Sequence, residues 1–223
     1  MASRGHRAEA SRPAPRLYLA TPQLAEASDL AAGLSDALAA ADVAAVLLRL
    51  ASADDRALVD RVKSFVPLVQ ERGAALVLDG HQHIVSQCGA DGAHLTGIDQ
   101  FRAALAALKP ERIAGCGGLK SRHDAMVAGE VGADYVMFGE PDNAQHRPSF
   151  AAILERIAWW AELFEVPCVG YAANAEEVAA LAAAGADFVA LGEWVFTHSG
   201  GHRGPAAAIN DAARSLAMAD LAV

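Results

Sequence analysis

Polar side chains that could do chemistry follow the short apolar runs of this sequence. Each run has the length of a strand buried on both faces. Parallel α/β folds bring the residues at the carboxyl ends of such strands to one rim. The side chains in question mix carboxylates with cations and imidazoles, which predicts a polar pocket for a small-molecule ligand. They are Arg49, Asp79, His81, His83, His94, Asp99, Lys120, Glu140, Asp142, Tyr171 and Glu193.

Two of the carboxylates, Asp79 and Asp99, could share a Mg²⁺ ion. This ion takes carboxylate oxygens and keeps coordination positions for water and a phosphate substrate. The alternative is that Asp79 is a solvated strand end and Asp99 caps a helix. A zinc site is disfavoured, because no cysteine or third histidine is suitably spaced with His81 and His83.

Two glycine-rich segments could bind an anion through backbone N–H groups. Residues 115–118, Gly-Cys-Gly-Gly, lack the spacing of a P-loop, and the thiol of Cys116 is expected to be a small buried group. Residues 199–204 combine glycines with Arg203 just before a helix. For both segments the alternative is a loop that only lets the chain turn.

A helix-to-strand pattern is repeated along the chain. Gly-Ala-Asp followed by an apolar run begins at Gly89, Gly132 and Gly185, and a looser copy begins at Ala41. Glycine closes a helix readily because it adopts the left-handed conformation. The repeat therefore predicts a parallel α/β fold.

The predicted elements alternate throughout the sequence. Strands are expected at 17–20, 43–50, 75–79, 92–95, 112–115, 135–138, 168–171 and 188–191, and helices at 25–40, 55–72, 84–88, 99–108, 121–131, 148–164, 174–185 and from 205 onward. Eight such units predict a single (β/α)8 TIM barrel over residues 17–223, after a disordered N-terminal tail over 1–16. An open doubly wound sheet would need a glycine-rich turn after the first strand, and residues 21–23, Thr-Pro-Gln, do not provide one.

The composition limits the partners and the compartment. With 18 basic and 27 acidic side chains, the formal charge is −9, which argues against nucleic acid or an anionic membrane as a partner. No apolar run is long enough to span a bilayer. Three cysteines without a disulfide or metal spacing favour reduced thiols in a cytoplasmic protein. Trp159, Trp160 and Phe164 could form a homodimer contact.

Three motifs resemble a known family, thiamine-phosphate synthase together with its relative the thiazole tautomerase. They are Leu-Tyr-Leu at 17–19, Ala-Asp-Gly-Ala-His-Leu-Thr-Gly-Ile-Asp at 90–99 and Gly-Ala-Asp-Tyr-Val-Met-Phe-Gly at 132–139. The similarity extends from residue 17 to about residue 195. It implies a TIM barrel enzyme of thiamine biosynthesis, a transferase that uses magnesium. Such an enzyme joins hydroxymethylpyrimidine pyrophosphate to a thiazole phosphate and releases pyrophosphate.

The resemblance also assigns roles to residues. It implies that Asp99, and Asp79 by proximity, hold Mg²⁺, and that Arg49, Lys120 and Arg147 bind pyrophosphate, with Arg49 and Lys120 as catalytic candidates. One family ligand position is Gly80 here, next to Asp79. His94 and Glu140 are further candidates for substrate binding at the mouth, and Arg203 could assist from the last loop.

The positions that match the family's thiazole phosphate site are altered most. They carry Gly170, Tyr171 and Glu193. A Glu193 carboxylate about 5 Å from a phosphate, at an effective dielectric of about 20, repels it by roughly 3 kcal/mol per unit charge. That energy is about a hundredfold in affinity. The sequence therefore favours a divergent relative that binds a small ligand at an acidic mouth, and the alternative is an active thiamine-phosphate synthase.

Overall fold

The computed structural model describes residues 13–26, 30–142, 144–197 and 204–220. Most of the predicted tail over 1–16, and most of the glycine-rich segment 199–204 including Arg203, lie outside these residues. Arg16, the last residue of that predicted tail, is the first residue of a strand.

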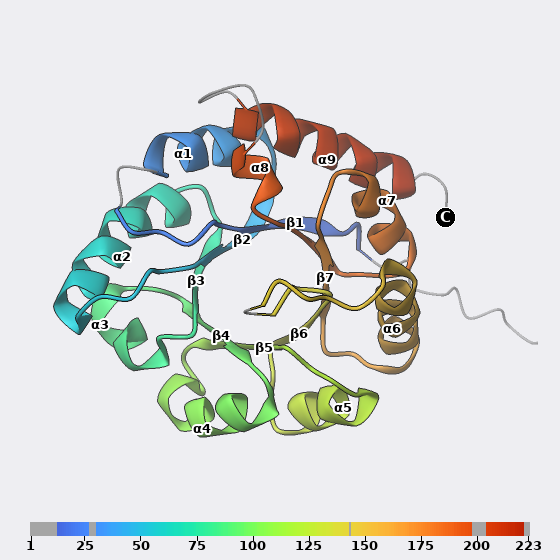
Figure 1. Ribbon diagram of the computed structural model, residues 1–223, viewed down its shortest axis with the longest axis horizontal. Coiled ribbons are helices and arrows are strands. Elements are labelled where there is room, and N and C mark those ends of the chain that lie inside the picture. The colour runs from blue at the N-terminus through green and yellow to red at the C-terminus, as the bar shows by residue number, and fades with distance from the viewer. Residues whose placement is uncertain (1–12, 27–29, 143, 198–203, 221–223) are drawn as a thin grey trace, which may run out of the picture.

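Eight parallel strands close into a barrel in chain order (Figure 1). The closure is made by the first and last strands, where Tyr18 pairs with Ala190. The strands are β1 (Arg16–Ala20), β2 (Val43–Leu48), β3 (Ala75–Asp79), β4 (Gly92–Thr96), β5 (Ile113–Gly117), β6 (Tyr135–Phe138), β7 (Cys168–Ala172) and β8 (Phe188–Leu191). The predicted single (β/α)8 barrel is confirmed, and the open sheet is excluded.

Helices surround the barrel, as Figure 1 shows. Side-chain caps begin several of them at the predicted residues: Ser121 begins α5, and the Asn174 side chain accepts N–H groups of Glu176 and Glu177 at the start of α7. Within the described ranges, no helix is long and apolar enough to cross a membrane. The helices are α1 (Ala31–Ala40), α2 (Asp55–Gln70), η2 (Gln82–Ile84), α3 (Val85–Cys88), α4 (Ile98–Leu108), α5 (Arg122–Glu130), α6 (Phe150–Leu163), α7 (Glu176–Ala183), α8 (Trp194–Thr197) and α9 (Gly204–Asp220).

Two apolar regions fill the fold. One lies between strands and helices and includes Trp160, which is fully buried and stacks on Phe164 with ring centroids 4.1 Å apart. Part of the aromatic group predicted to form a homodimer contact therefore packs inside the helical layer. The other region fills the barrel itself, with Tyr18, Tyr135 and Met137 among its members. The barrel interior is a packed core with chemistry only at its ends.

The repeated aspartates fasten the amino-terminal ends of neighbouring strands. The Oδ2 atoms of Asp91, Asp134 and Asp187 each accept the N–H group of a residue at or near the start of the preceding strand, at 2.7 to 2.8 Å. In the looser copy, Asp42 instead forms an ion pair with Arg16 of β1 at 2.8 Å. The Gly-Ala-Asp repeat thus fixes strand register at the end of the barrel opposite the mouth.

Candidate functional site at the carboxyl ends of the strands

A cavity of about 470 Å³ opens at the carboxyl ends of the strands. Ala20, Leu47, Met137 and Phe138 give it apolar walls. Its polar lining joins residues from six strand ends and from α6, which the sequence separates widely. The charged or polar lining residues are Arg49, Asp79, His94, Thr96, Lys120, Glu140, Asp142, His146, Arg147, Arg156 and Tyr171.

Arg49, which follows β2, is held between two carboxylates. Its Nη1 lies 2.5 Å from Glu193 Oε1, and its Nε lies 3.3 Å from Asp79 Oδ2. Its backbone N–H donates to the hydroxyl of Thr21 at 3.1 Å. The expectation of an uncompensated Glu193 carboxylate is therefore wrong, because that carboxylate is already paired with a guanidinium.

Glu140 reaches back across the barrel from the turn after β6. Its Oε1 accepts the backbone N–H of Gly118. Burial of the carboxyl group raises its pKa to about 7, the Gly118 N–H lowers it, and nearby Asp79 raises it. A Cβ on Gly117 would lie within 2.5 Å of both Glu140 Oε1 and His94 Nε2, so both side chains occupy the space beside this glycine.

His94 begins a hydrogen-bonded column that descends into the barrel. Its Nδ1 lies 3.0 Å from the hydroxyl of Tyr135, which lies 2.9 Å from the hydroxyl of Tyr18. Burial lowers the pKa of His94 to about 4 and raises the pKa of Tyr18 and of Tyr135 above the ordinary tyrosine value. At neutral pH the column is therefore uncharged.

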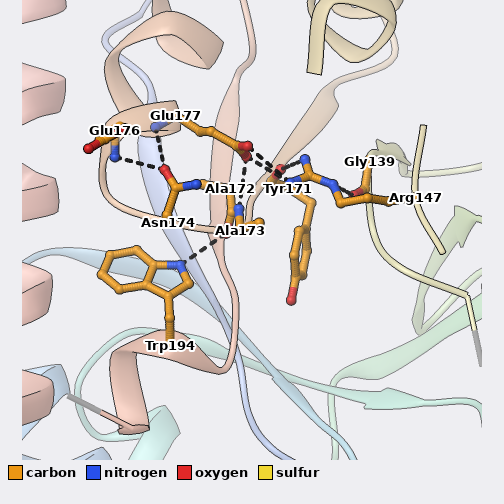
Figure 2. Close-up of polar contacts among 9 residues, drawn as sticks. All are labelled: Gly139, Arg147, Tyr171, Ala172, Ala173, Asn174, Glu176, Glu177 and Trp194. Carbon is orange, nitrogen blue, oxygen red and sulfur yellow. Dashed lines mark hydrogen bonds and ion pairs between the residues drawn. The ribbon is translucent and has the colours of Figure 1, made fainter. Parts of the chain in front are cut away.

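Arg147 lines the cavity, but its hydrogen bonds go to the protein (Figure 2). Its Nη1 donates to both carboxylate oxygens of Glu177 at 3.0 and 3.1 Å. Its Nε donates to the carbonyl of Gly139 at 3.0 Å, and its Nη2 donates to that of Tyr171 at 3.1 Å. These hydrogen bonds tie the segment after β6 to α7 and to the end of β7, which is a structural task distinct from the pyrophosphate binding predicted for Arg147.

Two other cations at the rim form no ion pair with the described residues. Within the described ranges, the ammonium group of Lys120 has no hydrogen-bond or ion-pair partner. Arg156 of α6 donates to the carbonyls of Leu119 and Lys120 at 2.6 and 3.4 Å. Sequence reasoning missed Arg156, although a signal exists: it lies between the buried Ile153 and Ile157 on the inner side of its helix.

Three predicted site residues of the described ranges do not line the cavity, namely Asp99, Gly170 and Glu193. Asp99 is exposed in the first turn of α4 and does not line the cavity. A Cβ on Gly170 would meet Ile157 at 2.7 Å and Leu181 at 3.0 Å, so this residue faces the helices. Arg203 lies outside the described residues. Glu193 does not line the cavity either but contacts it through Arg49.

The arrangement does not fit a preformed magnesium site. Among the residues that the structure describes, no three His, Cys, Asp or Glu side chains are grouped to hold a metal ion. Of the predicted pair, Asp79 lines the cavity but is bonded to Arg49, and Asp99 lies outside it. The position next to Asp79 is Gly80, which has a φ of +70° and no side chain to offer.

Comparisons with known proteins agree with this architecture. Residues 17–196 match the family model described as thiamine monophosphate synthase. A thiamine-phosphate synthase of Rhodospirillum centenum is 42% identical over 200 residues, which cover 88% of this chain and 95% of the relative. One of Hyphomonas neptunium is 37% identical over 215 residues, 92% of this chain and 97% of the relative.

A solved structure of thiamine phosphate pyrophosphorylase from Pyrococcus furiosus superposes with a TM-score of 0.74 at 21% identity. The match covers 92% of this chain and 96% of that chain. At that identity the superposition supports the fold alone, whereas the family model and the two synthases match almost the whole barrel by sequence. The chain therefore belongs to the thiamine monophosphate synthase family.

Proposed function

We propose that this protein is an active thiamine-phosphate synthase, a transferase of thiamine biosynthesis. It joins hydroxymethylpyrimidine pyrophosphate to a thiazole phosphate and releases pyrophosphate. The observation that carries the proposal is the 42% identity to a protein named thiamine-phosphate synthase over 95% of that relative's length. An identity that spans the relative almost end to end includes the segments that form the mouth.

The cavity has the chemistry that this reaction needs. The carbon–oxygen bond to pyrophosphate breaks, the electron pair leaves with the pyrophosphate, and the thiazole nitrogen supplies the pair for the new carbon–nitrogen bond. Fixed cations next to the leaving group stabilise the negative charge as it develops. Lys120, Arg156 and Arg49 lie around the cavity and can supply them. Met137, Leu47 and Ala20 give apolar walls to a heteroaromatic ring.

The Arg49–Glu193 pair weakens the strongest electrostatic objection to this activity. The repulsion estimated from sequence assumed a lone carboxylate beside a phosphate, and the guanidinium 2.5 Å away offsets part of that charge. An anionic substrate would meet one guanidinium shared by Glu193 and Asp79 in place of an isolated negative group. Active synthesis is therefore favoured here over the divergent binder favoured by the sequence.

The divergent binder stays as a second candidate because of one observation. Asp99 lies outside the cavity, and Asp79 is paired with Arg49, so the expected pair of magnesium ligands is not assembled. Such a protein would use its carboxylates to hold a cationic or hydrogen-bond-donating ligand.

A cytoplasmic location and a homodimer are further proposals, based on the cysteine pattern and the partly exposed Trp159.

The test is direct synthesis with the purified chain. Both substrates are supplied with Mg²⁺, and thiamine phosphate and released pyrophosphate are measured together. Equal amounts of the two products are expected. A Lys120→Met variant should show weaker pyrophosphate binding, and Lys63→Met, on the outer side of α2, is a control of equal charge change. Absence of turnover together with absence of binding of the pyrimidine pyrophosphate would overturn the proposal.

A further inference from the structure

Glu140 is a half-buried acid of the cavity lining that the reaction outlined above does not use. It follows Gly139, whose φ of +96° turns the chain after β6, and its side chain returns to the floor of the cavity. The segment Gly139-Glu140-Pro141 thus places a carboxylate in the lining of the pocket.

The fold gives the Glu140 carboxylate no adjacent cation. Among the described residues no cationic side chain lies within 4.0 Å of it, its hydrogen bonds come from its own backbone N–H and that of Gly118, and Arg156 acts on it from further away. Partial burial of a carboxylate without an adjacent cation has a desolvation cost. Gly117 has no side chain where one would overlap this group, so the backbone preserves space for the acid. These observations indicate that a ligand completes the site.

The surroundings of Glu140 define the shape and polarity of that ligand. Nε2 of His94 lies beside Oε1 on the same floor, and the imidazole is uncharged at neutral pH. Met137 and Leu47 from the barrel interior add apolar lining, and the free cation Lys120 lies at the exposed rim. These surroundings match a flat ring that has hydrogen-bond donors on the edge facing Glu140 and an anionic group directed toward Lys120.

We propose that Glu140 is a specificity-determining residue that receives the amino edge of an aminopyrimidine ring. A carboxylate oxygen accepts an N–H of the exocyclic amino group, and a protonated carboxyl can also donate to the adjacent ring nitrogen. The choice of pyrimidine rests on the proposed function. The pairing works in both protonation states, whereas a ring with hydrogen in place of the amino group offers no N–H to the carboxylate.

The same contact assists bond cleavage. When the electron pair leaves with pyrophosphate, positive charge spreads from the exocyclic carbon into the ring and its amino group. The amino N–H then becomes a stronger donor, so its bond to a carboxylate strengthens in the transition state. The proton stays on the amino nitrogen, and no other reactant is required.

The test compares two small uncharged ligands by calorimetry, 4-amino-5-hydroxymethyl-2-methylpyrimidine and 5-hydroxymethyl-2-methylpyrimidine, which has hydrogen in place of the amino group. The native protein should bind the amino compound at least about tenfold more tightly, because the other compound leaves the carboxylate acceptor unpaired. In Glu140→Met this preference should fall to about twofold or less. Glu162→Gln, an exposed residue of α6, should keep it in full.

Inorganic pyrophosphate serves as the internal control. Its affinity should stay the same or rise in Glu140→Met, because the substitution removes a negative charge that acts on Arg156, one of the rim cations. If that variant loses both ligands, Glu140→Gln decides: its neutral amide oxygen can accept either the Gly118 N–H or the amino group, and as a weaker acceptor than a carboxylate it should narrow the preference to about threefold. Either variant retaining the tenfold preference would overturn the assignment.

The role of Glu140 and the synthase activity of the chain are tested by different results. Native protein that makes thiamine phosphate but shows no amino preference retains the function and loses the role of Glu140. Native protein that shows the amino preference, lost in Glu140→Met, but makes no thiamine phosphate loses the function and retains the role of Glu140.

Discussion

The two ends of this barrel use carboxylates in opposite ways. At the amino-terminal end, Asp91, Asp134 and Asp187 each accept a backbone N–H at 2.7 to 2.8 Å, in the same position of the same repeat. At the mouth, Asp79 and Glu140 have unlike partners, and each is incompletely neutralised. The amino-terminal end, with its repeated aspartates, holds the strands together. The mouth leaves hydrogen-bonding capacity for a ligand.

The largest expected effect is on anion binding at the mouth. Arg49→Met leaves Asp79 and Glu193 without their guanidinium, and two carboxylates then face any bound anion. At about 5 Å and an effective dielectric of about 20, each contributes roughly 3 kcal/mol of repulsion, so pyrophosphate affinity should fall about a hundredfold or more. Calorimetric titration with pyrophosphate measures this loss.

A substitution at Glu193, the ion-pair partner of Arg49, tests the same anion binding. Glu193→Gln removes one carboxylate and releases part of Arg49, so pyrophosphate affinity should rise. Its effect is therefore opposite in sign to that of Arg49→Met. A fall in affinity for Glu193→Gln would contradict the view that this carboxylate competes with the anion for Arg49.

The next effect concerns stability at the opposite end. Asp134→Ala deprives the buried N–H of Ala114 and the ammonium of Lys109 of their acceptor. An unsatisfied buried donor and a lost charged hydrogen bond should lower the free energy of unfolding by about 2 kcal/mol. Urea denaturation measures this change, and pyrophosphate binding by the folded variant should stay within about twofold. Asp134→Asn, which keeps an acceptor oxygen, should lose less.

This contrast also explains what could be predicted from the sequence. The Gly-Ala-Asp repeat marks the fold because every copy solves the same local problem of ending a helix and registering a strand. The strand predicted at 112–115 extends through Gly117. A glycine pair resembles a turn, and the reason for Gly117, the side chains of Glu140 and His94 above it, comes from distant segments.

The site was harder to predict because its contacts join remote residues. Arg49 and Glu193 are 144 positions apart, and nothing local to either residue indicates the pairing. Arg147 matched the charge expected of a pyrophosphate ligand, but its partner Glu177 lies 30 positions away on α7. The positions of strand ends were predictable, whereas the partners that decide what each charge can do were not.

A smaller effect should appear in the pH dependence of stability. The pKa of Glu140 is about 7 in the folded protein, above the ordinary glutamate value of 4.5. The folded state therefore binds more protons than the unfolded state between these values, and this group's contribution to stability falls as pH rises through that window. Glu140→Gln removes the term and should raise stability at pH 8 relative to the native protein by about 2 kcal/mol.

In the native protein, His94 changes the stability with pH in the direction opposite to Glu140. Its pKa is lowered from 6.5 to about 4, so its contribution is complete above pH 6.5 and is lost as pH falls towards 4. In the native protein, the contributions of Glu140 and His94 to the free energy of unfolding change in opposite directions with pH and partly cancel. In Glu140→Gln, urea denaturation between pH 4.5 and 8 should therefore show the free energy of unfolding rising with pH because of His94 alone. The groups that act on Glu140, Asp79 and Arg156, are unchanged in this variant. Identical pH profiles for both proteins would show that the Glu140 carboxyl is not desolvated.

The smallest expected effect is at Asp99, and it tests the boundary of the mouth. This carboxylate is exposed in the first turn of α4 and lines no part of the cavity. Asp99→Asn keeps the shape of the side chain and loses only a weak interaction with the helix dipole, a few tenths of a kcal/mol. Thiamine phosphate synthesis with Mg²⁺ should therefore change by less than about twofold, whereas Asp79→Asn, inside the cavity, should change it more. A loss of tenfold or more in Asp99→Asn would mean that substrate and metal draw this residue into the site, and the division between a closed, paired end and an open, ligand-binding end would have to include the start of α4.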